Sequence, residues 1–335
     1  MNKNVAIVGS RGAVGKEMRE ILIQRKFPIG EIRFFGSSNS GENEISFGGK
    51  KYPVRQLTFS EKDFKGVDLV LSSPGASVSR KFIPYAVKAG AVVIDNSSAF
   101  RMDPQVPLVI PEINVSDLKQ HRGIIANPNC SAVVLLMAIT PLYRKNRIKR
   151  VICATYQSTS GAGAQAMKEL EDQTRDWLEG KAISKKAFPH QIAFNLFSHD
   201  SPVSRDGANE EETKVIQESK KILHDNTIRF GITCVRVPVF RAHSQAIHLE
   251  FEKPMTPEEA RKILSRSPGV QVVDDPEKNY FPMPIEASGG DHVLVGRIRK
   301  DPSSDTGLAL FACGDQLRKG AALNAVQIAE ELLKT

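Results

Sequence analysis

The sequence lacks the features that mark membrane-spanning, secreted and metal-binding proteins. No apolar run approaches the roughly 18 residues of a transmembrane helix. The first residues enter an expected strand, Val5–Val8, without the pattern of a signal peptide. The cysteines lie far apart and form no CxxC pair, so neither a zinc site nor a disulfide framework is indicated: Cys130, Cys153, Cys234 and Cys313. We therefore expect a reduced, cytoplasmic protein without a metal site.

The charge of the chain is basic but is not gathered into one region. Lysine and arginine number 46 against 38 aspartate and glutamate residues, which gives a formal net charge of +8. No basic cluster is interleaved with aromatic residues, as it would be in many nucleic-acid binders. The excess is more typical of an enzyme that handles anionic ligands. We expect small-molecule partners, no nucleic acid and no membrane.

The 335 residues are enough for two domains, and the periodicity changes near residue 130. Before that point strands and helices alternate, which predicts a doubly wound parallel sheet of the Rossmann type. The expected strands are Val5–Val8, Ile32–Phe35, Val67–Ser72 and Ala91–Asp95, and the expected helices are Gly15–Gln24 and Ser79–Ala89.

After residue 130 longer strands with period-2 alternation predict an α+β arrangement with a mixed or antiparallel sheet. The expected strands are Val151–Gln157, Thr227–Val237, Ala246–Phe251, Val293–Ile298 and Leu308–Cys313, followed by a last helix over Gly320–Leu333. We expect residues 1–129 to form the first domain, completed by the C-terminal segment 315–335, and residues 130–314 to form the second.

A glycine-rich loop follows the first strand. Gly9, Gly12 and Gly15 are spaced G-x-x-G-x-x-G between that strand and the first helix. Glycines allow a tight turn and close approach of the backbone to a pyrophosphate, and the helix N-terminus attracts negative charge. The pattern predicts a dinucleotide site, and the alternative is an ordinary glycine-rich turn.

The end of the second strand bears on the choice of cofactor. An NAD site usually has an acidic residue there to bind the ribose 2′-hydroxyl. This chain has Phe35-Gly-Ser-Ser-Asn-Ser-Gly41, which contains hydroxyls and an amide but no acid, and also no arginine or lysine. The segment favours NADP, and the alternative is a plain polar loop.

Cys130 follows Asn127-Pro128-Asn129 and precedes an apolar run that reads as a buried helix. At the first turn of that helix, unpaired N–H groups and the helix dipole favour a thiolate. The alternative is a small buried cysteine beside a core helix. Together with a nicotinamide cofactor, a cysteine nucleophile predicts oxidation or reduction at the acyl level through a thioester.

These motifs, in this order, resemble the aspartate-β-semialdehyde dehydrogenase family over essentially the whole chain. The resemblance rests on Gly9–Gly15, Ser37–Gly41, Asn96–Asp103 with Val106–Asn114, Asn127–Cys130, Tyr156-Gln157 with Ser160–Gly163, and Arg236–Ser244. It implies a Rossmann-type domain followed by a catalytic and dimerisation domain, a fold shared with glyceraldehyde-3-phosphate dehydrogenase. Two positions depart from the family pattern: Asn39 stands where arginine is frequent, and Gln316 where asparagine is usual.

The resemblance also implies residue roles. Cys130 would be the nucleophile, Gln157 would orient the tetrahedral intermediate, and His243 would be the general acid/base. Arg236 would bind the substrate carboxylate, Glu211 the ammonium, Arg101 and Lys214 the phosphate, and Asn129 would help to stabilise the oxyanion. The cofactor would contact Gly9, Arg11, Gly12, Ala13, Val14, Gly15, Ser37, Ser38, Asn39, Ser40, Ser73, Ser160, Gly161 and Gln316. Without the family, Arg236 reads as a salt-bridged strand residue, and Glu211 with Lys214 as a solvated face.

The activity that the resemblance implies is NADPH-dependent reduction of L-aspartyl-4-phosphate to L-aspartate 4-semialdehyde, in lysine, threonine and methionine biosynthesis. Related reductases and a catalytically inactive relative are the alternatives. The Asn-Pro-Asn-Cys context and the Arg-x6-His spacing oppose the former, and retention of all four key residues opposes the latter. A homodimer is expected, with a tetramer as the larger option. We expect Val235, Val237 and Ile247 on a sheet face that a partner covers.

Overall fold

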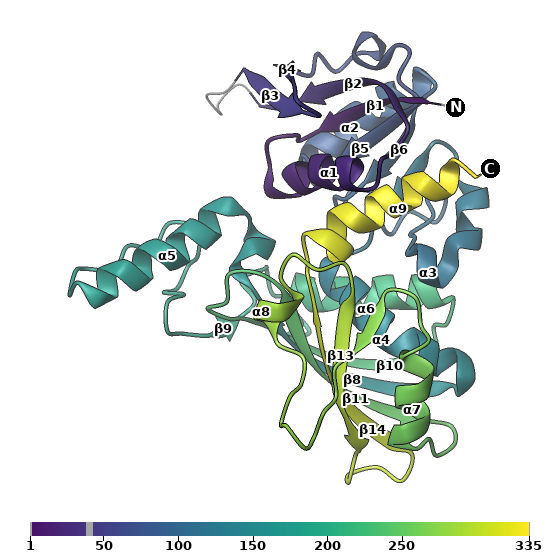
Figure 1. Ribbon diagram of the computed structural model, residues 1–335, viewed down its shortest axis with the longest axis vertical. Helices are drawn as coiled ribbons and strands as arrows, with labels where there is room; N and C mark the ends of the chain where they lie inside the picture. Colours follow the sequence, from purple (N-terminus) through teal and green to yellow (C-terminus); the bar gives the residue numbers. More distant parts are fainter. Residues whose placement is uncertain (1, 38–42, 335) are drawn as a thin grey trace. The chain divides into compact units, whose positions relative to one another are not determined.

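The computed structural model describes residues 2–37 and 43–334, and the chain forms two compact units (Figure 1). The first unit extends to Asn129 and resumes at Ala321, and the second comprises Cys130–Gly320. Segment 315–320 therefore belongs to the second unit, although the sequence assigned it to the first. The reason is Asp315, whose carboxylate accepts hydrogen bonds from Gly289 N–H and Arg241 Nε, both at 2.6 Å.

The first unit contains a seven-stranded sheet in the order β3-β4-β2-β1-β5-β6-β7. All neighbours are parallel except β3 and β4. The strands are β1 (Lys3–Val8), β2 (Ile29–Phe35), β3 (Glu44–Phe47), β4 (Lys50–Arg55), β5 (Leu69–Ser72), β6 (Val92–Asp95) and β7 (Ile124–Ala126). The helices are α1 (Ala13–Gln24), α2 (Ala76–Lys88), α3 (Pro111–Asn114) and α9 (Leu323–Leu332), with 3₁₀ turns η1 (Glu61–Phe64) and η2 (Val115–Gln120).

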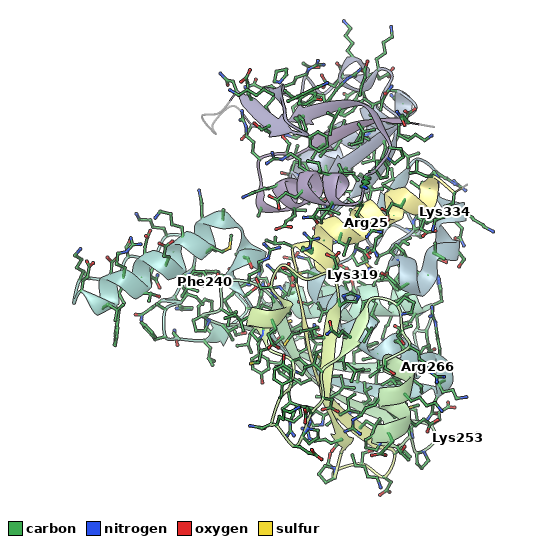
Figure 2. All side chains as sticks on the ribbon, in the orientation of Figure 1. Arg25, Phe240, Lys253, Arg266, Lys319 and Lys334 are labelled. Atoms are coloured by element: carbon green, nitrogen blue, oxygen red, sulfur yellow. The ribbon has the colours of Figure 1, made fainter. Side chains whose placement is uncertain are left out.

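Helices cover both faces of this sheet. Met18 and Ile21 of α1 pack with Val326 of α9 in one fully buried cluster, and Phe82 of α2 belongs to a second cluster. Arg25 at the end of α1 binds both carboxylate oxygens of Glu330 at 2.7 Å, which joins α1 to α9 (Figure 2). The expected Rossmann-type domain is confirmed, and its last helix comes from the far end of the chain.

The second unit contains a mixed seven-stranded sheet in the order β12-β13-β14-β11-β8-β10-β9. Its strands are β8 (Ile148–Gln157), β9 (Phe197–Ser198), β10 (Arg229–Arg236), β11 (His243–Phe251), β12 (Val270–Val272), β13 (Val293–Lys300) and β14 (Gly307–Gly314). Its helices are α4 (Cys130–Lys145), α5 (Ala164–Leu178), α6 (Glu210–Leu223), α7 (Pro257–Leu264) and α8 (Pro284–Ala287), with the 3₁₀ turn η3 (Thr159–Ala162). A π-helical turn, η4 (Arg318–Ala322), carries the fully buried side chain of Lys319 (Figure 2). Within the described part of the chain, no helix is long and apolar enough to cross a membrane.

The two faces of the second sheet differ. One face packs on α4, which is buried along nearly its whole length. The other face carries half-exposed apolar side chains, including Ile152 and Tyr156, each 37% exposed. The expectation that Val237 and Ile247 lie on the open face is wrong, because they are 8% and 0% exposed. Along β11 the odd-numbered residues are buried, so Ile247 points toward the helices.

Candidate active site

Cys130 is the first residue of α4, at the position where the N–H groups of a helix lack partners within the helix. The run that follows it is buried, which fixes the start of the helix against the sheet. The backbone of Gly320 lies against the cysteine: a Cβ placed on this glycine would be 2.9 Å from the Cβ of Cys130. A side chain at position 320 would displace the sulfur.

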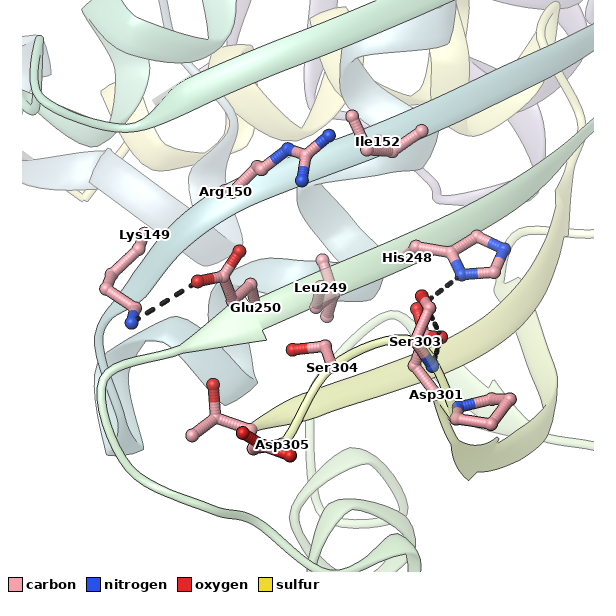
Figure 3. Close-up of a pocket in the computed structure, with 12 residues that line it drawn as sticks. Lys149, Arg150, Ile152, His248, Leu249, Glu250, Asp301, Ser303, Ser304 and Asp305 are labelled. Carbon is pink, nitrogen blue, oxygen red and sulfur yellow. Dashed lines mark hydrogen bonds and ion pairs between the residues drawn. The ribbon is translucent and has the colours of Figure 1, made fainter.

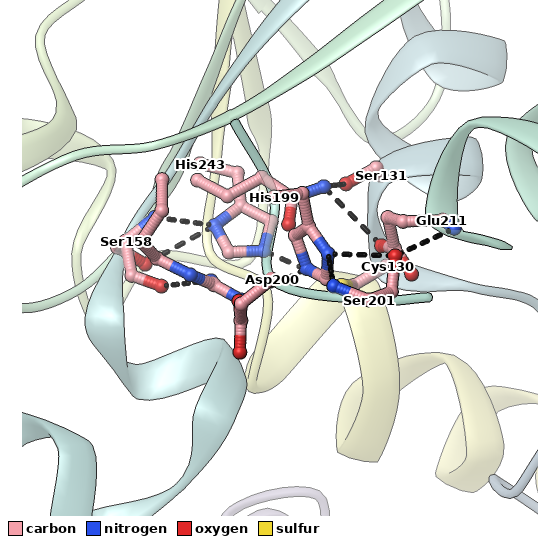
Figure 4. A network of polar contacts seen from close by, with 10 residues as sticks. Cys130, Ser131, Ser158, His199, Asp200, Ser201, Glu211 and His243 are labelled. Atoms are coloured by element: carbon pink, nitrogen blue, oxygen red, sulfur yellow. Dashed lines mark hydrogen bonds and ion pairs between the residues drawn. The ribbon is translucent and has the colours of Figure 1, made fainter. Parts of the chain in front are cut away.

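His243 begins β11 and faces the cysteine (Figure 4). Its Nε2 lies 3.4 Å from Cys130 Sγ, and its Nδ1 accepts the backbone N–H of Ser158 at 3.1 Å. Because a backbone N–H can only donate, the proton of the neutral ring belongs on Nε2, facing the sulfur. This arrangement favours a thiolate that accepts a hydrogen bond from His243.

The pKa of His243 is lowered well below its usual 6.5. Burial is the largest cause, because the side chain is 1% exposed, and the nearby Arg236 and His199 lower the pKa further. His243 is therefore neutral at physiological pH, with the single N–H that Ser158 assigns to Nε2.

Gln157, at the end of β8, links two helices at the site. Its Nε2 donates to Ser131 Oγ at 2.7 Å and to Glu211 Oε1 at 3.2 Å. Ser131 lies in the first turn of α4, next to the cysteine, and Glu211 lies in the first turn of α6. The capping box of Asn209 and Glu212 starts α6 there and positions Glu211, which is 7% exposed.

Arg236 ends β10 and is 3% exposed. Its Nη1 donates to Ser158 O at 2.9 Å, and its Nη2 contacts His199 Nε2 at 2.9 Å and Asp200 Oδ1 at 3.3 Å. Its buried Nε has no acceptor among the described residues. A buried guanidinium with an unused donor can bind a carboxylate.

The remaining residues of the second unit that the sequence predicted differ in placement. Lys214 pairs with Glu210 at 2.7 Å, and 27% of its side chain is accessible. A Cβ on Gly161 would lie 3.0 Å from the His243 ring, so this glycine borders the site directly. Gln316 is held between Ser160 Oγ, to which it donates, and Ala242 N–H, which it accepts at 2.8 Å.

The glycine loop of the first unit shows which glycines the fold needs. A Cβ on Gly9 would lie 2.8 Å from Ser73 C, and one on Gly15 would lie 2.3 Å from Gly9 O. A Cβ on Gly12 would meet only Gly9 O, at 3.4 Å, and Gly12 has an ordinary φ of −66°. The fold itself therefore tolerates a side chain at Gly12, and a close ligand explains why none is there. This open cradle, at the start of α1 with Ala13 and Val14, fits a dinucleotide pyrophosphate.

Two further observations in the first unit fit the same ligand. The buried Oγ of Ser73 has no hydrogen-bond partner among the described residues. Arg11 Nη1 donates to Ser37 O at 2.7 Å, so a cation from the glycine loop reaches the end of β2. Segment 37–41 itself contains no arginine or lysine, and Ser38, Asn39 and Ser40 lie outside the described residues.

Arg101 and Asn129 also belong to the first unit and are buried, at 9% and 6% exposure. Arg101 Nε donates to Asn127 O at 2.9 Å, and its Nη2 donates to Asn96 O at 2.8 Å. The guanidinium is thus fixed against the segment that leads to the cysteine.

Comparisons with known proteins agree with this geometry. Residues 4–121 match the profile of the semialdehyde dehydrogenase NAD binding domain, and residues 139–319 match that of the semialdehyde dehydrogenase dimerisation domain. The chain is 52% identical to the aspartate-semialdehyde dehydrogenase of Synechocystis sp., over 98% of this chain and 97% of the relative. It is 50% identical to that of Aquifex aeolicus, over 100% and 99%.

The chain belongs to the aspartate-semialdehyde dehydrogenase family. A solved structure of aspartate semialdehyde dehydrogenase II from Vibrio cholerae, complexed with ASA, superposes with a TM-score of 0.96 at 41% identity. The alignment covers 100% of this chain and 99% of that one. The predicted family, fold class and nicotinamide-binding domain are therefore confirmed.

Sequence reasoning missed three residues at the site of this dehydrogenase: Ser158, His199 and Gly320. Ser158 assigns the His243 tautomer through its backbone, so its side-chain type carries no signal. His199 reaches Arg236 from a point 37 residues earlier in the chain, and no spacing rule connects them. Gly320 was visible only as the start of the expected last helix.

A separate pocket of about 680 Å³ lies on the open face of the second sheet of the dehydrogenase (Figure 3). It is lined by Lys149 and Arg150 of β8, His248 of β11 and the loop 301–306. His248 Nδ1 and Asp301 Oδ2 are 2.7 Å apart there. None of the residues that surround Cys130 lines this pocket, so it is not the site of the cysteine chemistry.

Proposed function

We propose that this chain catalyses the NADPH-dependent reduction of L-aspartyl-4-phosphate to L-aspartate 4-semialdehyde through a thioester on Cys130. The observation that carries the proposal is the cysteine at the start of α4, 3.4 Å from the Nε2 of a buried neutral histidine. Gln157 and Arg236 belong to the same compact unit. Family membership supports the reaction class, and the Vibrio cholerae complex with ASA supports the aldehyde.

The first step makes the thioester. The Cys130 thiolate attacks the acyl carbon of the substrate, a C–S bond forms, and the C–O bond to phosphate breaks with its electrons going to the phosphate. The tetrahedral oxyanion needs donors close by, and backbone N–H groups at the start of α4, together with Asn129, are the candidates. Gln157, held between Ser131 and Glu211, would keep the intermediate oriented.

The second step reduces the thioester, and the nicotinamide supplies a hydride to its carbonyl carbon when bound. The resulting tetrahedral species collapses, and Cys130 leaves as a thiolate. His243 stabilises that thiolate as nucleophile and as leaving group by donating its Nε2–H. The protonated form of His243 is disfavoured by burial and by the nearby Arg236 and His199. We therefore propose that His243 acts as a hydrogen-bond donor, which is narrower than the general acid/base role predicted from the sequence.

The substrate carries a carboxylate, an ammonium and a phosphate. The buried Arg236 would bind the carboxylate through its unused Nε, and Glu211 would bind the ammonium. Arg101 and Lys214 are proposed to bind the phosphate. Each of these assignments follows the family pattern and can be tested by substituting the residue.

NADP is the proposed cofactor. The expectation rested on the absence of an acid at the end of β2, and the contact of Arg11 with Ser37 supports it by bringing a cation to that strand end. Ser73, with its unpaired Oγ, would face the same ligand. We expect a modest preference, and a kcat/KM ratio that favours NAD would reject it.

A homodimer is the proposed assembly, with a tetramer as the larger option, and the cytoplasm is the proposed location. The support is apolar exposure in the second unit: Ile152 and Tyr156 on the open sheet face, and Trp177 and Leu178 on α5 at 55% and 71% exposure. Sedimentation at micromolar concentration tests the proposal. A mass near 36.9 kDa for the wild-type chain would reject it.

The activity is tested in the reverse direction, as NADP reduction with L-aspartate 4-semialdehyde and phosphate. We expect strict dependence on phosphate, because the thioester must be resolved by it. N-Acetyl-L-glutamate 5-semialdehyde and glyceraldehyde 3-phosphate are the matched alternatives, since both are oxidised through a cysteine thioester. A higher kcat/KM with either of them would overturn the substrate assignment.

A further inference from the structure

The segment that follows β9 contacts the guanidinium of Arg236 through His199 and Asp200, both of which are labelled in Figure 4. His199 Nε2 lies 2.9 Å from Arg236 Nη2, and Asp200 Oδ1 lies 3.3 Å from the same nitrogen. Neither residue has been given a role in binding the substrate or in the bond changes described above. Since Arg236 is 3% exposed, these contacts decide how its donors are directed.

The ring of His199 can make this contact only while it is neutral. A guanidinium nitrogen only donates, so Nε2 must be the acceptor. With Nε2 as the acceptor, the single ring proton lies on Nδ1, where Ser201 Oγ at 3.1 Å can accept it. The backbone N–H of Ser201 also points at Nδ1, at 3.2 Å, so a donor group faces each ring nitrogen and the site disfavours a second ring proton. Ser201 Oγ in turn accepts the backbone N–H of Glu211 at 3.2 Å. A second ring proton would point at the donor group of Arg236.

We propose that His199 is a positioning residue for Arg236: its neutral ring directs the guanidinium toward the substrate carboxylate, and protonation of the ring releases that hold and weakens substrate binding. The inference rests on the proposed function, in which Arg236 binds that carboxylate. It adds a pH-dependent determinant of KM that does not touch the reacting atoms.

The charges around His199 come from several elements. They are Arg236 on β10, Asp200 on its own segment, Glu210, Glu211 and Lys214 on α6, and His243 on β11. The pKa of His199 is lowered from 6.5, with burial as the largest cause. Arg236 and Lys214 lower the pKa further, and Glu211 and Asp200 raise it in part. The neutral form therefore predominates at neutral pH, and the ring gains its proton on acidification below that.

The test compares the wild-type enzyme with His199→Gln, measuring KM for L-aspartate 4-semialdehyde and kcat between about pH 8 and about pH 5.5. The glutamine amide oxygen accepts from Arg236 at every pH. We expect the wild-type KM to rise about fivefold or more on acidification, and the variant KM to rise much less. The ratio of the two KM values at each pH cancels the titration of substrate and phosphate. The kcat values should stay within about twofold of each other.

Asp200→Asn is the matched control, because it removes the neighbouring carboxylate and leaves His199 in place. It should keep the acid rise in KM, displaced to a lower pH because the Asp200 carboxylate raises the pKa of His199. Parallel KM profiles for wild type and His199→Gln would overturn the proposal, and so would a loss of the rise in Asp200→Asn alone.

A second measurement needs no variant and covers the case in which His199→Gln does not fold. The wild-type enzyme is assayed with 3-aminopropanal, which lacks the carboxylate that Arg236 would bind. Its kcat/KM should fall less on acidification than that of L-aspartate 4-semialdehyde, and an equal fall would reject the proposal. Absence of any phosphate-dependent NADP reduction with the semialdehyde would reject the proposed function instead, so the two failures are distinct.

Discussion

The chemistry of His243 is set by its neighbours more than by the residue itself. The Ser158 N–H occupies Nδ1, Cys130 faces Nε2, and the side chain is 1% exposed. Each of these favours a neutral ring with its proton toward the sulfur. A neutral histidine in this orientation stabilises the thiolate by donating a hydrogen bond and keeps its proton. This suits a reaction in which the sulfur both attacks and leaves as an anion.

Replacing Arg236 by lysine tests whether this single residue binds the substrate carboxylate. A lysine keeps the charge but loses the planar set of donors that meets Ser158 O, His199 and a carboxylate together. We expect KM for L-aspartate 4-semialdehyde to rise by about tenfold or more, with a smaller change in kcat. Steady-state kinetics at saturating NADP and phosphate measure this. A normal KM for Arg236→Lys would remove Arg236 from the substrate site.

The placement of site residues was predictable where a motif fixed it in sequence. Cys130 is the first residue of its helix, and the spacing from Arg236 to His243 follows from one strand, a turn and the next strand. The contacts of Arg11 with Ser37 and of His199 with Arg236 cross between segments far apart in the chain. Such contacts depend on how distant segments pack together, and a local sequence pattern does not reveal that packing.

Among the elements, the loop between β1 and α1 contains two kinds of glycine: those that the fold requires and one that leaves space for a ligand. Gly9 and Gly15 have no room for a side chain, and Gly9 also has a φ of +81°. Gly12 has room and an ordinary backbone conformation. A substitution at Gly12 should therefore affect ligand binding alone, whereas the other two positions should affect folding.

We expect Gly12→Ala to bind NADP at least about tenfold more weakly while its stability stays within about 1 kcal/mol of wild type. Gly15→Ala is the contrast, because its Cβ would lie 2.3 Å from Gly9 O and must destabilise the unit. Fluorescence titration with NADPH and thermal denaturation report the two effects separately. Unchanged NADPH affinity in Gly12→Ala would mean that the pyrophosphate does not lie against this loop.

The strands and helices expected from the sequence lie within a few residues of the observed ones, but several other elements were missed, among them the 15-residue helix α5. The β3–β4 hairpin escaped notice, although Gly48 and Gly49, both with positive φ, form the two-residue turn that such hairpins favour. Ile247 was assigned to the wrong sheet face. Along β11 Ile247, Leu249 and Phe251 alternate with His248 and Glu250, so the alternation itself places Ile247 on the core face, and the expectation of a partner-covered face misread it.

For the whole molecule, two neutral histidines, the buried His243 and the half-buried His199, couple stability to pH. The pKa values of His199 and His243 are lowered from 6.5 in the folded protein, while the unfolded chain protonates near the ordinary value. The unfolded state then binds more protons below about pH 6.5, so acidification favours unfolding. At the alkaline end, burial raises the pKa of Cys234 and Cys313 to about 12, so their contribution is lost as pH rises above 9.

The free energy of unfolding should therefore fall as pH drops from about 7 to about 5, before most carboxylates titrate. His199→Gln should show a smaller fall over that window, because one of the two histidines is gone. Urea denaturation at a series of pH values measures both. If the wild-type protein were equally stable at the two ends of this window, the two histidines would not be held neutral in the folded protein.

The central claim is the covalent role of Cys130, and a burst experiment without phosphate tests it most directly. The enzyme is mixed with NADP and L-aspartate 4-semialdehyde, and the bound aldehyde should be oxidised once, leaving the thioester unresolved. The account predicts a burst of one NADPH per active site and an aspartyl adduct on the Cys130 peptide by mass spectrometry, with both absent in Cys130→Ser. Full phosphate-dependent turnover by Cys130→Ser, or a wild-type burst without an adduct at Cys130, would contradict it.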